Sequence, residues 1–335
     1  MTQPAAGLGP GRPSRTSIMV AAARAFGARE PDPSVRNPDH LAERLLGPAE
    51  RELIREHPIA AALEGDYQHG RQNMDVAGTT NLLLVRTRLI DEHLLRALER
   101  GATQVVILGA GFDTRGYRFQ DQLRGKRLFE VDHHGTQEFK KRRAAEVLGS
   151  PPDHLTYVEI DFHNDKLADA LHRAGYRSGA QTFFVSEGVC MYLKEESVRQ
   201  TLRFVAAESA AGSSLVLDYA CRATLDVLDR FPNHPAHSFS THWGEPWLFG
   251  MPDNREREFF RECGLELRES ISLVRGRAQR RYLTRADGTR LGRGRPARLA
   301  AGLKMFAASL PFIWLGLTRR TQWYALAEVV VPARN

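Results

Sequence analysis

The chain has 335 residues, of which 42% are hydrophobic and 26% charged, and its formal net charge is +7. This balance is typical of a soluble globular protein with one large domain, and it excludes the disordered and fibrous classes. The 28 glycines and 17 prolines follow no period, which excludes a collagen-like chain. Three widely spaced cysteines, without a CxxC pair or nearby histidines, predict no disulfide framework and no metal site. They favour a reducing, cytoplasmic location.

The N-terminal residues 1–13 are rich in glycine and proline and lack the apolar core of a signal peptide. We expect a mobile leader there and no export. Helical patterns follow, and they predict an N-terminal helical cap over residues 14–100. The expected cap helices are 41–57, interrupted at Gly47-Pro48, and 79–100.

Short apolar runs alternate with helical patterns through the centre of the chain. The expected strands are 103–108, 127–131, 155–160, 182–186 and 214–219. The expected helices between them are 114–123, 136–148, 166–174 and 195–211. This alternation predicts a parallel, doubly wound α/β sheet.

A helix at 253–263 and two late strands, at 265–274 and 322–331, are expected after this core. The late strands predict an antiparallel edge on the sheet. The second domain would then be 101–335, with an insertion between the late strands.

The insertion, residues 275–320, holds the excess positive charge. It contains twelve lysines and arginines and a single acid, Asp287. Few aromatic side chains accompany these cations, so we expect no nucleic-acid partner.

The insertion also contains an apolar stretch, Leu299–Leu317, for which two interpretations stay open. Because arginines flank it on both sides, residues 293–320 could lie on an anionic membrane as an interfacial helix. The other interpretation is a lid or a helix packed on the sheet, which Lys304 and Pro311 favour because they interrupt the apolar run.

The loop after the first expected strand is a candidate ligand site, because open α/β sheets bind ligands at the carboxyl ends of their strands. Gly109 and Gly111 allow a tight turn and a close approach of the backbone to a ligand. The second strand ends in Glu130 and Asp132, where this fold places a carboxylate for ribose hydroxyls.

Two nucleoside cofactors fit this pattern. A dinucleotide would require a third glycine at position 114, where this chain has Thr114, and Asp113 would repel its phosphates. S-adenosyl-L-methionine has no phosphate and carries a positive sulfonium, so the residues favour it. An NAD-linked oxidoreductase stays as the alternative, together with a methyltransferase-like module that binds the cofactor or a membrane without turnover.

The next two strand ends add further candidates. Asp161 and Phe162 follow the third strand, where an acid and an aromatic ring can bind adenine; Asp161 could equally cap the next helix. Glu187 follows the fourth strand and is expected in the central crevice.

Together these residues resemble a known family. The segments VVILGAGFDTRGYRF (105–119), LFEVD (128–132), Asp161-Phe162 and SEGVCMYL (186–193) are similar to the leucine carboxyl methyltransferase family. They are most similar to its bacterial branch of S-adenosyl-L-methionine-dependent methyltransferases. The resemblance extends to SRTSIMVAAARAFGARE, VRTRLIDEHL and GEPWLFGM, and it is weakest over residues 279–317.

The resemblance implies a Rossmann-like class I methyltransferase sheet of seven strands, the last antiparallel, with an N-terminal helical cap. It implies that Gly109 lies at the methionine part of the cofactor, Asp132 at the ribose, and Asp161 and Phe162 at the adenine. It also implies that Arg86 pairs with the cofactor carboxylate, that Glu187 lies near its amino group, and that Arg15 is a basic residue of the cap. Arg88 could take the place of Arg86, but the two lie on different helix faces.

The expected reaction is methyl transfer to oxygen, as a carboxylate or a hydroxyl, of a small-molecule acceptor. A carboxylate acceptor needs no general base, whereas a hydroxyl acceptor needs one within reach. The candidate bases are Tyr192 and His242.

Overall fold

The structure is a computed structural model that describes residues 13–162, 165–230, 245–292, 294, 310 and 323–333. His242 and nearly all of the stretch 299–317 lie outside these residues.

One seven-stranded sheet forms the centre of the molecule, in the order β3-β2-β1-β4-β5-β7-β6. Strand β7 is antiparallel to β5 and β6, and the other pairs are parallel. The expected seven-stranded methyltransferase sheet is confirmed. Its strands are β1 (Gln104–Leu108), β2 (Arg127–Asp132), β3 (Leu155–Glu159), β4 (Thr182–Ser186), β5 (Ser214–Ala220), β6 (Glu266–Ser272) and β7 (Tyr324–Val330).

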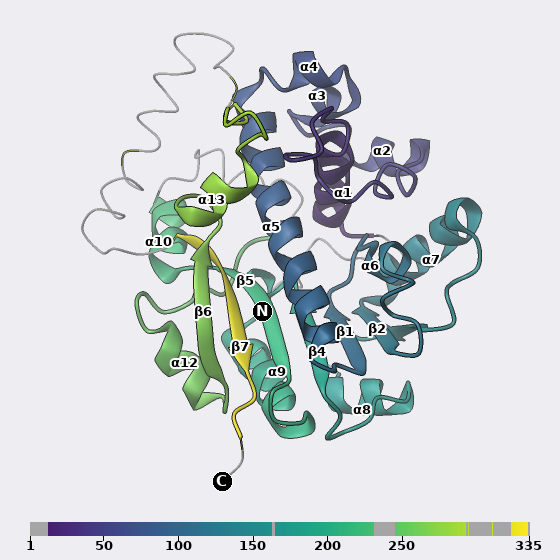
Figure 1. Cartoon of the computed structure of the whole chain (residues 1–335), viewed down its shortest axis with the longest axis vertical. Helices are drawn as coiled ribbons and strands as arrows, with labels where there is room; N and C mark the ends of the chain where they lie inside the picture. The colour runs from purple at the N-terminus through teal and green to yellow at the C-terminus, as the bar shows by residue number, and fades with distance from the viewer. Residues whose placement is uncertain are drawn as a thin grey trace, which may run out of the picture.

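The central strands are apolar because helices cover both faces of the sheet. Along β1, Val105 and Ile107 belong to one buried cluster, and Val106 and Leu108 to the other, as the two-residue period of a strand requires. The first cluster includes α1 (Arg15–Gly27) and α5 (Met74–Glu99). The second includes α8 (Leu167–Arg173), α9 (Glu195–Glu208) and α12 (Glu256–Glu262). In Figure 1, α5 crosses in front of the sheet and α9 lies behind it.

The N-terminal helices gather at one end of the sheet, around the upper part of α5 (Figure 1). Helix α1 packs against α5 and against the first two of the three short helices that follow it, and its Phe26 ring contacts Tyr67 of the third. These are α2 (Pro48–Ile54), α3 (Ala60–Glu64) and α4 (Tyr67–Gly70). The remaining short elements are α6 (Arg115–Arg118), α7 (His134–Leu148), η1 (Cys190–Tyr192), α10 (Arg222–Arg230) and α13 (Arg277–Tyr282).

Several helix boundaries differ from the expected ones. The helix expected at 114–123 is the single turn α6, because Gly116 and the polar run 120–122 offer few apolar side chains to bury. The helix expected at 41–57 exists only from Pro48, whose ring suits the first helical position. Helix α5 begins at Met74, five residues earlier than expected. The side chain of Asn73 caps this end, because it accepts hydrogen bonds from the amides of Asp75 and Val76.

The described part of the basic insertion includes α13, which packs against α5. Ala278, Gln279 and Tyr282 are buried, while Arg277 and Arg281 pair with Glu269 and Glu92. Among the residues described, no helix combines the length and apolar character needed to cross a bilayer.

Candidate functional site

The loop after β1 turns sharply at two glycines with positive φ, 61° at Gly109 and 47° at Gly111. A Cβ atom on Gly109 would overlap a methyl group of Val189, and one on Gly111 would lie 3.1 Å from the Cβ atom of Ser17. Both glycines are therefore required by the backbone conformation and by close packing. The loop lies between the segment after β4 and the cap helix α1.

Asp132 ends β2 and contacts this loop. Its carboxylate accepts hydrogen bonds from the amides of Gly111 and His133, the latter at 2.6 Å. Burial raises the pKa of Asp132, against the effect of these two amides. The other acid of the strand, Glu130, is 1% exposed and pairs with Lys140. Of the two acids, Asp132 is therefore the one at the loop.

Three arginines surround Glu187, which follows β4. Its Oε2 atom lies 2.7 Å from Nη1 of Arg115, and its Oε1 atom 2.9 Å from Nε of Arg86 and 3.8 Å from Nη1 of Arg24. Burial alone would raise the pKa of Glu187, but Arg115, Arg86 and Arg24 hold it well below its ordinary value. Glu187 is therefore an ionised carboxylate inside the protein.

Arg86 connects Glu187 to the far half of the sheet. Its Nη1 atom donates to Asp218 of β5 at 2.8 Å and to the hydroxyl of Tyr324 of β7 at 3.1 Å. Tyr324 in turn donates to Asp218. Arg88 instead donates to the carbonyl groups of Pro33 and Arg36. The structure separates the two arginines, as their spacing predicts, and Arg86 is the one beside Glu187.

Helix α1 closes the site from the cap. Arg15 is its first residue, and the amide of the N-cap residue Ser14 donates to Thr136 at 3.1 Å. Further along the helix, the buried Arg24 donates to the carbonyl of Phe112 at 2.7 Å and pairs with Asp39 at 3.0 Å. The cap is thus tied directly to the glycine loop.

Asp161 and Phe162 lie after β3, and the structure puts Phe162 in a small apolar pocket. The pocket lies at the carboxyl ends of β1 and β4, next to Ser186 and Cys190. The Asp161 amide donates to the carboxylate of Asp165 at 2.8 Å. The buried Cys190 thiol donates to the carbonyl of Asp218 at 3.0 Å, a packing role.

Tyr192 ends η1 beside the segment that follows the undescribed residues 231–244. Leu248 and Phe249 donate their amides to the carbonyl of Met191, which holds this segment in place. Burial raises the pKa of Tyr192 to about 12. Its phenol is therefore protonated at neutral pH and is a poor base.

Asp113, which is expected to repel a phosphate, is paired with a cation in the structure. The Asp113 carboxylate pairs with the Arg115 guanidinium and accepts the Arg115 amide at 2.6 Å, and the residue is 4% exposed. Arg115, which also pairs with Asp91 and Glu187, offsets part of this charge. The argument against a dinucleotide then depends on Thr114, whose hydroxyl donates to Asp39 at 2.5 Å.

The sequence analysis missed several residues of the candidate site, among them Arg24, Arg115, Asp218, Tyr324 and Glu245. Two of them carry a visible signal. Arg24 is the single charge in the apolar run 18–26, and Asp218 is the single acid in an apolar strand. Such isolated charges must find partners when they are buried, so they point to a buried network.

The site residues fit the amino-acid part of S-adenosyl-L-methionine. Although Arg86 Nε and Glu187 Oε1 are 2.9 Å apart, neither makes a hydrogen bond of acceptable geometry within the described residues. The Arg86 guanidinium can therefore pair with the carboxylate of the cofactor, and the Glu187 carboxylate can pair with its ammonium group.

The pH dependence of stability tests the buried charge of Glu187. Because its folded pKa lies below the ordinary value of 4.5, Glu187 stabilises the fold above pH 4.5, and this contribution is lost as the pH falls further. We expect Glu187→Gln to reduce the loss of unfolding free energy between pH 5 and pH 3, by up to about 1.4 kcal/mol per pH unit. Urea unfolding at pH 5, 4 and 3 measures this. Glu195→Gln, which alters an exposed pair with Arg199, should leave the pH dependence unchanged; equal slopes in wild type and Glu187→Gln would contradict the prediction.

Comparisons with known proteins identify the family of this chain. The family model described as leucine carboxyl methyltransferase matches residues 17–206. A protein of Mycolicibacterium smegmatis named "Putative S-adenosyl-L-methionine-dependent methyltransferase" is 35% identical over 204 residues, which cover 61% of this chain and 66% of that protein. A protein of Mycobacterium avium with the same kind of name is 32% identical over 228 residues, 68% of this chain and 72% of that protein. The matches thus span about two thirds of these relatives.

Among solved structures, magnesium protoporphyrin IX methyltransferase from Synechocystis with bound SAH has a TM-score of 0.42 and 12% identity. The superposition covers 75% of this chain and 85% of that one. The family model covers more than half of the chain, from the cap helix α1 through α9, and includes the glycine loop, Asp132 and Glu187. The chain therefore belongs to the leucine carboxyl methyltransferase family of S-adenosyl-L-methionine-dependent methyltransferases.

Proposed function

We propose that this chain transfers the methyl group of S-adenosyl-L-methionine to a hydroxyl oxygen of a small-molecule acceptor. The observation that carries the proposal is the half-buried carboxylate of Glu245, which lies near Tyr192. Its Oε2 atom accepts a hydrogen bond from Ser14 at 3.1 Å, whereas its Oε1 atom is buried and has no hydrogen-bond partner among the described residues. Such an atom suits an acceptor that brings its own O–H donor.

The charge balance of the site also supports this cofactor. Linked ion pairs join four guanidinium groups to five carboxylates, so the buried network has an excess negative charge. In a medium of low polarity this excess favours a bound cation such as a sulfonium. The groups are Arg24, Arg86, Arg115, Arg118, Asp39, Asp91, Asp113, Glu187 and Asp218.

Different residues of the site would hold different parts of the cofactor. Arg86 and Glu187 would hold the amino-acid part of the cofactor and Asp132 its ribose hydroxyls. Asp161 and Phe162 would contact its adenine. When bound, S-adenosyl-L-methionine supplies an electrophilic methyl group. Helix α1 covers the glycine loop, which excludes water from the site and aligns the reactants.

Glu245 would accept the hydroxyl proton as the acceptor oxygen gains the methyl group. The protonated Tyr192 would act as a hydrogen-bond donor to the acceptor. Trp247 stacks on Tyr324, with ring centroids 6.1 Å apart, and this aromatic wall favours an acceptor with an apolar or aromatic body.

A carboxylate acceptor is the second candidate, because the matching family model is described as leucine carboxyl methyltransferase. A carboxylate is already a nucleophile and needs no base. It would also place a negative charge near Glu245, which the excess of acids in the site disfavours.

An acceptor screen with tritiated methyl donor separates the two candidates. We expect phenols and alcohols to take up label that stays non-volatile in base, because ethers resist hydrolysis. Glu245→Gln should lower kcat at least about 100-fold without changing the Kd of S-adenosyl-L-methionine, whereas Tyr192→Phe should lower kcat less than about tenfold. Label released as volatile methanol in base, or a fully active Glu245→Gln variant, would instead support a carboxylate acceptor.

A further inference from the structure

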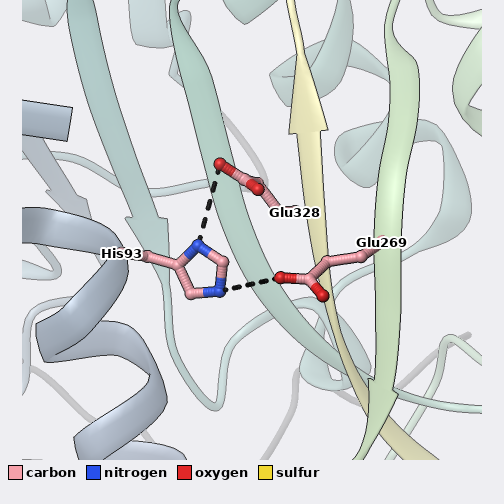
Figure 2. A group of neighbouring side chains, drawn as sticks. All are labelled: His93, Glu269 and Glu328. Atoms are coloured by element: carbon pink, nitrogen blue, oxygen red, sulfur yellow. Dashed lines mark ion pairs between the residues drawn. The ribbon is translucent and has the colours of Figure 1, made fainter. Parts of the chain in front are cut away.

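A second group of polar side chains lies away from this site, between α5 and the antiparallel edge of the sheet. His93 projects from α5 toward Glu269 of β6 and Glu328 of β7 (Figure 2). One ligand atom from each residue lies within 4.8 Å of the other two. None of the three takes part in the contacts around Glu187.

The imidazole of His93 is 2% exposed, and neither ring nitrogen makes a hydrogen bond in the described residues. Nε2 lies 3.5 Å from Oε1 of Glu269, and Nδ1 lies 3.7 Å from Oε1 of Glu328. These separations are too long for hydrogen bonds. One ion can bind only one of the two ring nitrogens, because these point in different directions. With one ligand atom from each residue, the three atoms all lie within 4.8 Å of one another, so one carboxylate has to turn toward the nitrogen that the other faces.

The sheet itself places the two carboxylates together. Glu269 and Glu328 are directly opposite each other on antiparallel strands, a position where like charges destabilise a sheet. A register shift between Leu267 and Glu269 sets this pairing, with Arg268 as the additional residue. Irregularities of this kind commonly re-aim a side chain at a functional position.

Both carboxylates also contact arginines, with which a bound ion would share them. Arg268 and Arg100 contact Glu328 at 3.4 and 3.8 Å, and about half of each side chain is exposed, so both can move away. Arg277 binds the other oxygen of Glu269, Oε2, which leaves Oε1 directed at His93.

We propose that His93, Glu269 and Glu328 bind a divalent transition-metal ion such as Zn²⁺ or Mn²⁺. One imidazole nitrogen and two carboxylates suit these ions, whereas Mg²⁺ prefers oxygen ligands alone. Glu269 is partly exposed, with 27% of its side chain accessible, so water completes the coordination from that side.

The bound ion has a structural role. His93 lies seven residues after Arg86, two turns along the same face of α5, about 10 Å from it. Glu328 lies four residues after Tyr324 on β7. The ion therefore holds together α5 and β7, the elements that carry Arg86 and Tyr324. Because it lies about 10 Å from Arg86, it takes no part in methyl transfer.

Calorimetric titration of the untagged full chain, stripped with EDTA, tests this site with ZnSO₄, MnCl₂ and MgCl₂. We expect one Zn²⁺ per chain, weaker Mn²⁺ binding and no Mg²⁺ binding. At a hundredfold excess over Kd, Zn²⁺ should raise Tm by about 5 °C. Co²⁺ in place of Zn²⁺ should give visible absorption bands from His and carboxylate coordination.

Glu269→Gln should weaken Zn²⁺ binding at least tenfold, and His93→Gln should abolish it. Glu266→Gln, an exposed glutamate on the same strand, is the matched control and should bind as wild type does. If His93→Gln fails to fold, Glu269→Gln still decides the question. Absence of Zn²⁺ binding, or equal binding by Glu269→Gln and wild type, would overturn the proposal and leave His93 as a buried residue packed between the two glutamates.

Discussion

Replacement of Arg115 by methionine is expected to lower the free energy of unfolding by about 3–5 kcal/mol. The Arg115 guanidinium is 1% exposed and pairs with Asp91 at 2.8 Å, with Glu187 at 2.7 Å and with Asp113. Methionine fills much of the same volume but leaves three buried carboxylates around an apolar side chain. The loss is then that of uncompensated buried charge rather than of packing.

Urea unfolding of wild type and Arg115→Met at pH 7 measures this loss. Arg124→Met is the matched control, because Arg124 is 82% exposed and its pair with Asp121 lies at the surface. It should change the free energy of unfolding by less than about 0.5 kcal/mol. A change below about 1 kcal/mol for Arg115→Met would mean that the neighbouring arginines alone can neutralise these carboxylates.

The sheet was predictable because each central strand is a short apolar run with helices on both sides. Val105 to Leu108 are all buried, although their side chains point to both faces of the sheet. A continuous apolar run therefore identifies this strand without an alternation of apolar and polar residues. Helix ends were less predictable, because they depend on single contacts. Helix α5 begins early because the Asn73 side chain binds its first free amides. The N-terminal helices are held to the glycine loop by the buried hydrogen bond from Arg24 to Phe112, which no period in the sequence indicates.

The candidate site could be predicted only where its residues belong to short contiguous motifs at the ends of strands. Gly109, Gly111 and Asp132 lie in contiguous segments at strand ends, and the structure joins them through one hydrogen bond from an amide to a carboxylate. The network beyond them joins residues 132 positions apart, such as Arg86 and Asp218. The spacing of residues in the sequence does not predict such pairs. They meet because of the order in which the strands are arranged in the sheet. The same is true of His93, Glu269 and Glu328.

Loss of the Asp132 carboxylate is expected to weaken binding of S-adenosyl-L-methionine and S-adenosylhomocysteine about 100-fold. A carboxylate that accepts two hydroxyl donors contributes about 3 kcal/mol to binding, and that amount corresponds to this change in Kd. Calorimetric titration of Asp132→Ala with both compounds measures it. Asp132→Asn, which keeps one acceptor oxygen for the Gly111 amide, should lose about tenfold and shows whether the loop still folds.

Glu159→Ala is the matched control for this measurement. Glu159 is the register partner of Asp132 on β3, but its carboxylate is half-exposed and pairs with His134 at 3.1 Å. Its removal should change neither Kd more than about twofold, and NAD should bind to none of the proteins. If Asp132→Ala bound both compounds as tightly as wild type, the ribose would have to lie elsewhere. The Gly111 contact would then be the only role of Asp132, a stabilisation of the glycine loop.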